Sequence, residues 1–192
     1  MRGREFLRWT QWVLFITGAI AVSYVALTLL YAKFYQEAAG KVLERQISDQ
    51  EQPKASLSTS VAKQGDVLGR IEIPRLGMKV MILEGTTAHT LRLGVGHIKG
   101  TAIPGQPGNI GIAGHRDTYF RALKDIRTND KIQIQTPTGL SNYEVDKVQV
   151  VAPEDTGILA QSAGSAITLV TCYPFQFIGG APERLVVHAH KE

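Results

Sequence analysis

An uncharged stretch near the N-terminus limits what the first part of this 192-residue chain can fold into. No Asp, Glu, Lys or Arg occurs between Arg8 and Lys33, and residues 12–32 form a mostly apolar run. As a helix that rises 1.5 Å per residue, this run is about 31 Å long, which matches the ~30 Å hydrocarbon core of a bilayer. We therefore predict a transmembrane helix, acting as a membrane anchor, at residues 12–32.

The residues that flank this apolar run predict its orientation. Three arginines and one glutamate precede it, whereas basic and acidic residues are mixed after it. The positive-inside rule then places residues 1–11 in the cytoplasm and the chain beyond residue 33 outside, as in a single-pass protein of the cell membrane. A cleaved signal peptide that ends near the small residues 38–40 is the alternative, but its apolar part is usually about 7–15 residues long.

Residues 33–65 are predicted to connect the anchor to a folded domain. Apolar side chains recur in rough helical phase over residues 34–47, which favours a juxtamembrane helix. Residues 48–65 are polar and Ser-rich and are interrupted by Pro53, as is typical of a flexible linker. The remaining residues, 66–192, are enough for one hydrophobic core and are predicted to form a single domain.

Charge and cysteine content exclude several functions for that domain. The chain has 8 basic and 5 acidic residues before Asp66, but 13 and 12 from Asp66 onward. A nearly neutral domain lacks the basic face that supplies most of the affinity for nucleic acid, so no nucleic acid is expected among the partners. Cys172 is the only cysteine, which excludes an intramolecular disulfide, a Cys-rich zinc site and a CxxC redox pair.

Hydrophobic periodicity predicts that residues 66–192 form a mainly β fold. Short apolar or alternating segments bounded by turn residues predict strands at 68–73, 78–83, 109–113, 131–136, 142–151, 166–171 and 184–190. Residues 86–93 and 119–126 are predicted as short helices, each with a Thr or Asp near its start that can cap it. Short strands without long helices between them favour a sandwich or closed barrel over a doubly wound parallel sheet.

Three residues combine into candidate catalytic chemistry. Cys172 directly follows the predicted strand 166–171, and His115 lies just past the predicted strand 109–113; at strand ends a barrel presents side chains to a groove. A free thiol titrates near pH ~8.5 and needs a base or a cationic neighbour to act as a nucleophile, a role open to His115. Arg184 starts the last strand and carries several N–H donors, which suit an oxyanion. The simpler interpretations are a Cys172 buried as a small apolar side chain and an Arg184 paired with Glu183.

The other histidines point less clearly to chemistry. His89 lies in a predicted helix and is interpreted as a surface or capping residue. His97 lies in a Gly-bracketed loop, where backbone hydrogen bonding is the simplest role. His188 and His190 alternate along one strand and therefore share a face, but the sequence places no third ligand beside them. No metal site is predicted.

The motifs around the three candidate residues resemble those of sortases, the membrane-anchored cysteine transpeptidases of the bacterial surface. The matching segments are NIGIAGHRDTYF, which contains His115, TLVTC, which ends at Cys172, and ERLVVHA, which contains Arg184. Cys172 follows His115 by 57 residues and Arg184 follows Cys172 by 12. The resemblance covers Leu68 to His190, and TLVTC looks closest to class D or E. The linker lacks the DPW or DPF lid motif of pilin-assembling sortases.

This resemblance implies a fold and a reaction. The fold would be a closed eight-stranded sortase-type β-barrel with short helices. Cys172 would attack the Thr carbonyl of an LPxTG-like sorting motif and form a thioacyl enzyme, while His115 would act as general acid and then general base. Arg184 would bind the oxyanion or the substrate backbone, and Thr171 would help to shape the oxyanion site. The loop at residues 152–165 would close over the motif.

The resemblance also implies partners at the membrane. They are surface proteins with a C-terminal sorting motif and an amine acceptor such as a peptidoglycan precursor, which together yield a protein joined to the cell wall. No cofactor is expected, although the acidic residues Glu84, Asp117 and Asp155 leave modulation by calcium open.

Two other functions stay open. One is another cysteine peptidase or amidase that acts on the cell wall, although papain-like enzymes place Cys before His and L,D-transpeptidases place Arg almost directly after Cys. The other is a non-catalytic, membrane-anchored β-barrel binding module in which Cys172 is inert core.

Overall fold

The computed structural model describes residues 2–50, 62–160, 164–177 and 179–192. These residues fall into two compact units, divided between Tyr35 and Gln36. The first unit is helical, and the second contains a β-barrel together with the last residues of the same helix. The barrel is the part of the molecule that positions the candidate site.

Helix α1 (Arg2–Gln50) is uninterrupted. The first proline of the chain is Pro53, so no residue before it removes a backbone donor from the helix. Part of α1 is long and apolar enough to cross a membrane: its most apolar window has a mean hydropathy of 2.3 and is wholly exposed. The predicted helices at 12–32 and 34–47 are thus parts of one helix, while residues 51–61 of the predicted linker lie outside the described residues.

The end of α1 belongs to the second unit and packs against the barrel. Ala39 and Leu43 are buried, Leu43 completely. On the same helical stripe, the side chain of Gln36 accepts a hydrogen bond from the backbone N–H of Met81 at 2.9 Å and donates one to the carbonyl of Leu93. Residues 36–50, which were expected to lie in the connection, belong to the folded unit.

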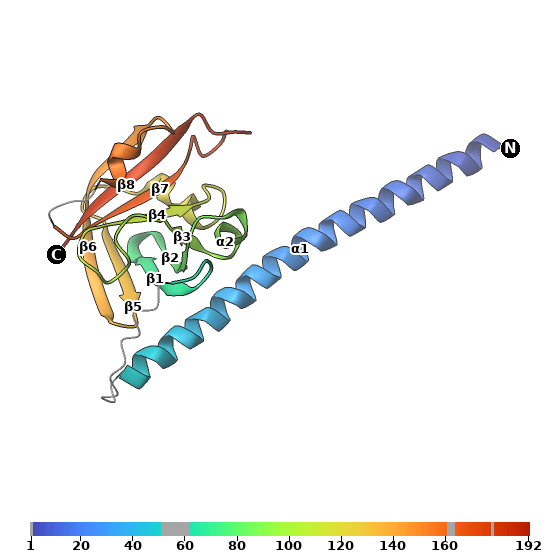
Figure 1. The fold of residues 1–192 in the computed structure, drawn as a ribbon. Helices are drawn as coiled ribbons and strands as arrows, with labels where there is room; N and C mark the ends of the chain where they lie inside the picture. Colours follow the sequence, from blue (N-terminus) through green and yellow to red (C-terminus); the bar gives the residue numbers. More distant parts are fainter. Residues whose placement is uncertain (1, 51–61, 161–163, 178) are drawn as a thin grey trace. The chain divides into compact units, whose positions relative to one another are not determined.

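Eight strands close into a barrel in the order β1-β2-β3-β4-β7-β8-β6-β5 (Figure 1). The strands are β1 (Val67–Ile73), β2 (Met78–Glu84), β3 (Val95–His97), β4 (Asn109–Gly114), β5 (Lys131–Thr136), β6 (Gly139–Val151), β7 (Ala166–Tyr173) and β8 (Glu183–Lys191). The pairs β2–β3 and β4–β7 are parallel, and the other six pairs are antiparallel. The expected mainly β, closed eight-stranded barrel is confirmed.

Short helical segments lie in the connections between strands. They are η1 (Pro74–Leu76), α2 (Ala88–Leu93), η2 (Tyr119–Asp125) and η3 (Thr156–Leu159). Thr87 caps α2 as predicted, because its side chain accepts a hydrogen bond from the N–H of Thr90. The predicted helix at 119–126 is the 3-10 helix η2, where Thr118 makes no side-chain cap.

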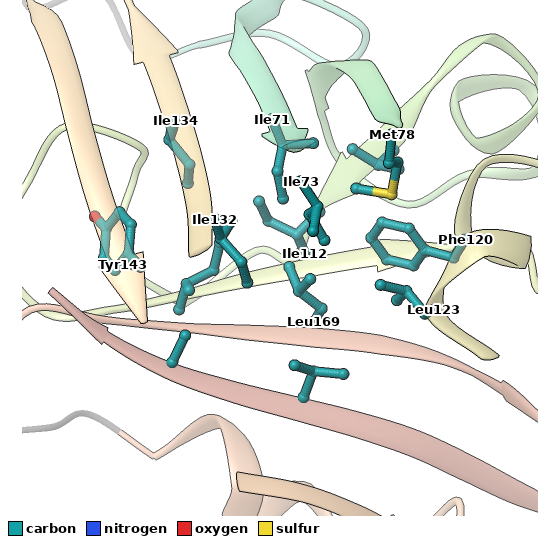
Figure 2. Close-up of a cluster of buried hydrophobic side chains, with 14 of the residues drawn as sticks. Ile71, Ile73, Met78, Ile112, Phe120, Leu123, Ile132, Ile134, Tyr143 and Leu169 are labelled. Atoms are coloured by element: carbon teal, nitrogen blue, oxygen red, sulfur yellow. The ribbon is translucent and has the colours of Figure 1, made fainter. Parts of the chain in front are cut away.

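The barrel interior is filled by side chains from alternate strand positions (Figure 2). Ile71, Ile112, Ile132 and Leu169 come from four different strands and are all fully buried. Phe120 of η2 joins the same cluster, so this helix covers part of the core. Each such side chain contributes about 1.5–3 kcal/mol relative to an exposed position. The packing of this cluster fixes the strands whose ends carry the candidate site.

Two strands differ from the sequence prediction in ways that matter for the site. β3 has only three residues, and glycines stand before it and at its centre, so it shows no alternation and its sequence predicted a loop. β7 continues through Cys172 and Tyr173, beyond the predicted end at residue 171. Cys172 therefore lies within the paired strand, not in the segment that follows it.

Candidate active site

Parallel pairing of β4 with β7 brings His115 and Cys172 to the same edge of the barrel. Gly114, the last residue of β4, pairs with Thr171 of β7. His115 and Cys172 are the next residues along each chain segment, and neighbouring strands lie about 4.8 Å apart. Both residues are partly exposed, so their side chains are not core filler.

Arg184 lies opposite Cys172 on the other neighbour of β7. The two are direct partners in the antiparallel β7–β8 register. Residues in that relation share one face of the sheet, with Cβ atoms about 4.5–5.5 Å apart. The structure therefore gathers Cys172, His115 and Arg184, which are far apart in the sequence, at one rim of the barrel.

Strand alternation assigns Cys172 and Arg184 to the outer face of the barrel. Leu169 on β7 and Leu185 on β8 belong to the interior cluster. Cys172 is three residues from Leu169 and Arg184 is one residue from Leu185, so both lie on the opposite face of their strands. Thr171 is 2% exposed, and its hydroxyl donates to the carbonyl of Gly114 at 2.8 Å. Thr171 thus supports the site from beneath, by tying β7 to β4.

The guanidinium of Arg184 is held by backbone carbonyls. Its Nη1 donates to the carbonyl oxygens of Ala181 at 3.2 Å and Glu183 at 2.9 Å. No ion pair between Arg184 and the Glu183 carboxylate occurs in the part of the chain that the structure describes. The simpler interpretation of Arg184 as an ion-pair partner of Glu183 is therefore wrong, and Arg184 is the strand partner of Cys172.

Gly114 makes room for the helix that follows His115. A Cβ at position 114 would lie only 2.7 Å from the ring of Phe120, which is fully buried. The backbone N–H of Phe120 also donates to the carbonyl of His115 at 3.1 Å. The ring therefore packs where a side chain would otherwise stand, and it fixes the turn from β4 through His115 into η2.

Asn109 anchors η3, part of the predicted closing loop, to the barrel. Its side-chain amide donates to the carbonyls of Ile158 at 3.4 Å and Ala160 at 3.2 Å, while its carbonyl oxygen accepts from the hydroxyl of Thr168 at 2.8 Å. Asn109 and Thr168 are both buried. This network holds one segment beside the outer face of β4 and β7; residues 161–163 of the same loop lie outside the described residues.

His97 and Glu84 form a buried pair between the neighbouring strands β3 and β2. His97 lies in β3, and its Nδ1 is 2.7 Å from a carboxylate oxygen of Glu84. Its Nε2 is 3.1 Å from the carbonyl oxygen of Ala102. The expected backbone hydrogen bond is thus present, but the predicted loop position is wrong. Glu84 is occupied by this contact, and Asp117 and Asp155 are exposed.

His188 and His190 share one face of β8, as predicted, and both contact Asp146 of β6. The Nδ1 atoms lie 2.7 and 3.3 Å from its carboxylate oxygens. Partial burial raises the pKa of Asp146, but the two imidazoles outweigh that effect and bring the pKa below its ordinary value. Within the described residues, no group of three His, Cys, Asp or Glu side chains is arranged to hold a metal ion. His89 is exposed in α2.

Fold and site together define a class of protein. Its fold is a closed mixed β-barrel, and its site is a partly exposed cysteine on a strand between one that leads to a histidine and one that carries an arginine. The Sortase domain family matches residues 71–192. The chain is 36% identical to sortase D of Bacillus subtilis (strain 168) over 163 residues, which are 84% of this chain and 79% of that protein. The chain therefore belongs to the sortase family, whose members are transpeptidases.

Solved structures agree with this assignment. A Clostridium perfringens sortase D5 transpeptidase superimposes with a TM-score of 0.67 and 30% identity, over 83% of this chain and 97% of that chain. Sortase A from Corynebacterium diphtheriae gives a TM-score of 0.62 at 30% identity, over 84% of each chain. These values show the same barrel fold. By its length and apolar composition, α1 is a candidate membrane anchor.

Proposed function

We propose that this protein is a cysteine transpeptidase that uses Cys172, His115 and Arg184 to join sorted surface proteins to a cell-wall amine. The observation that supports this most strongly is the strand register. It sets Cys172 directly opposite Arg184 and one residue beyond the Gly114–Thr171 pair, next to His115. A nucleophile, a proton carrier and a permanent cation are the groups that acyl transfer through a thioester needs.

In the proposed reaction, the Cys172 sulfur attacks the Thr carbonyl carbon of an LPxTG-like motif. The Thr–Gly amide bond breaks, His115 gives a proton to the departing glycine amine, and the Thr acyl group remains on sulfur as a thioester. An acceptor amine then attacks the thioester, His115 takes up its proton, and the Cys172 sulfur is released. Arg184 stabilises the negative charge that develops on the carbonyl oxygen in both steps.

We propose that α1 holds the barrel on the outer side of the cell membrane, with residues 1–11 in the cytoplasm. The excess of arginine before the apolar run supports this orientation. Substrates and acceptors attached to the same membrane are confined near the barrel, which raises their effective concentration. Partial exposure of Cys172 speaks against the alternative of a binding module with an inert core cysteine.

The test is an amide-transfer assay with the full-length chain in detergent micelles. An LPxTG peptide and a small primary amine are added, and the products are identified by mass spectrometry. We expect a new amide between the Thr carbonyl and the amine with the wild-type chain, and none with Cys172→Ala, which removes only one sulfur from a partly exposed position. Circular dichroism shows whether the variant is folded. Transfer at the wild-type rate by Cys172→Ala would refute the assignment, and cleavage without transfer would favour a peptidase.

A further inference from the structure

The guanidinium of Arg116 binds the backbone of a loop that is distant in the sequence. Its Nη1 donates to the carbonyl oxygen of Pro174 at 2.9 Å, and its Nη2 donates to those of Phe177 at 2.7 Å and Gly179 at 3.0 Å. All three acceptors lie in the connection between β7 and β8. Arginine suits this arrangement because its N–H groups spread over a rigid plane, whereas a lysine ammonium is a point donor.

This contact joins the segments that carry the three proposed catalytic residues. Arg116 directly follows His115, and Pro174 lies two residues after Cys172. The β7–β8 connection leads on to Arg184, and sheet pairing between the two strands ends one residue beyond Cys172. Beyond that pair, no backbone hydrogen bonds between β7 and β8 hold the described residues of the connection in place. Arg116 therefore supplies a bond between the end of β4 and the connection where the sheet does not.

We propose that Arg116 is a positioning residue for the transfer reaction. It fixes the β7–β8 connection against the segment that bears His115, so that the imidazole, the thiol and the Arg184 guanidinium keep one arrangement throughout both steps. This inference rests on the proposed function. The competing explanation is a brace that stabilises the fold without affecting catalysis. The two explanations differ in what they predict for kcat in a variant that is still folded.

The experiment compares the full-length Arg116→Ala and Arg116→Lys variants in detergent micelles with Arg121→Ala as the matched control. Arg121 is an exposed arginine in η2, five residues further along the chain. A displacement of about 1 Å at a reacting group can cost about a hundredfold in rate. We expect Arg116→Ala to lower kcat at least about tenfold with little change in KM for the LPxTG peptide, Arg116→Lys to recover only part of the loss, and Arg121→Ala to match the wild type.

Rates are measured at a temperature at which circular dichroism shows every variant to be folded. Hydrogen exchange of the peptide that follows Cys172 is measured in parallel, and it is expected to accelerate most in Arg116→Ala, less in Arg116→Lys and not in Arg121→Ala. A wild-type kcat in folded Arg116→Ala, or complete recovery by Arg116→Lys, would overturn the positioning role. A wild-type chain that transfers nothing would contradict the proposed function instead. Unchanged exchange in Arg116→Ala would count against the positioning role even then.

Discussion

Cys172, His115 and Arg184 come from three neighbouring strand segments, and each stands at or beside the end of its paired region. Their separation along the chain is large, but adjacent strands bring them within about two strand spacings of each other. Small and buried neighbours maintain this arrangement: Gly114 admits the Phe120 ring, and Thr171 binds β4 from below. The three candidate residues are thus partly exposed, whereas Gly114 and Thr171 are buried.

Removing either proposed partner of the thiol should impair transfer. We expect His115→Ala and Arg184→Ala each to lower the transfer rate at least about a hundredfold, because an acid–base group and an oxyanion donor are commonly worth that much. The measurement is the peptide–amine assay, with circular dichroism to show that the variants fold. His89→Ala, which changes an exposed histidine, serves as the control. A variant with an undiminished rate would remove that residue from the mechanism.

The sequence predicted the three candidate residues at this rim but missed two residues that hold their surroundings. Cys172, His115 and Arg184 lie in recognisable motifs, and local alternation placed each at a strand end. Asn109 and Arg116 instead bind backbone carbonyls about fifty to sixty residues away. A carbonyl is present at every position, so such partners leave no pattern in the sequence. Only the folded chain shows which loop each side chain reaches.

At the scale of elements, alternation located most strands because the barrel buries one face of each. β5 matches its predicted bounds, since KIQIQT alternates throughout. β3 was not predicted because three residues are too few to show the alternation of a strand. The end of α1 was assigned to a connection because its apolar positions are few, yet Gln36 and Leu43 pack it against the barrel. This segment belongs to the folded unit because of tertiary contacts, which a local sequence pattern does not reveal.

The packing of α1 on the barrel can be tested by a cavity in that contact. Leu43→Ala should lower the free energy of unfolding of the barrel unit by about 2–5 kcal/mol, the usual cost of truncating a fully buried leucine. Val42→Ala, at a position that is 50% exposed on the same helix, should change it little. Chemical denaturation of the full-length variants in micelles measures both. Equal stabilities of the two variants would show that this part of α1 does not belong to the folded unit.

Acid should weaken the contact between η1 and the turn before β5. Nη2 of Arg75 lies 2.6 Å from the buried carboxylate of Asp130, which also accepts the backbone N–H of Arg127 at 2.8 Å. The Arg75 hydrogen bond is the main cause that lowers the pKa of Asp130 below its ordinary value of 3.8. A carboxyl group with a lowered folded pKa stabilises the fold above its unfolded pKa, and that stability is lost as pH falls through the folded value.

We therefore expect Asp130→Asn to unfold more easily than the wild type at pH 7, and the difference to shrink below about pH 4 as Asp130 becomes protonated in the wild type. Denaturant midpoints of both proteins between pH 7 and pH 3 give the answer. Asp117→Asn, at an exposed carboxyl group, is the control. A difference between wild type and Asp130→Asn that is the same at both ends of this range would contradict the assigned role of the carboxylate.

At the scale of the whole molecule, the chain combines a candidate membrane helix with a barrel whose rim carries a thiol between two potential partners. The sortase family match covers residues 71–192 of the barrel, and α1 precedes that match. In the proposed reaction, the acyl group stays on sulfur until an acceptor amine arrives, and confinement at one membrane raises the effective concentration of that amine. The covalent intermediate proposed on Cys172 is therefore the step to test.

Intact-protein mass spectrometry tests that step most directly. The full-length chain is mixed with an LPxTG peptide in the absence of any amine, quenched in acid and weighed. We predict a mass increase equal to the acyl fragment that ends at Thr, mapped to Cys172, released by hydroxylamine and absent from Cys172→Ala. The same adduct on Cys172→Ala, or cleavage of the peptide by the wild type with no adduct at any time point, would contradict the account.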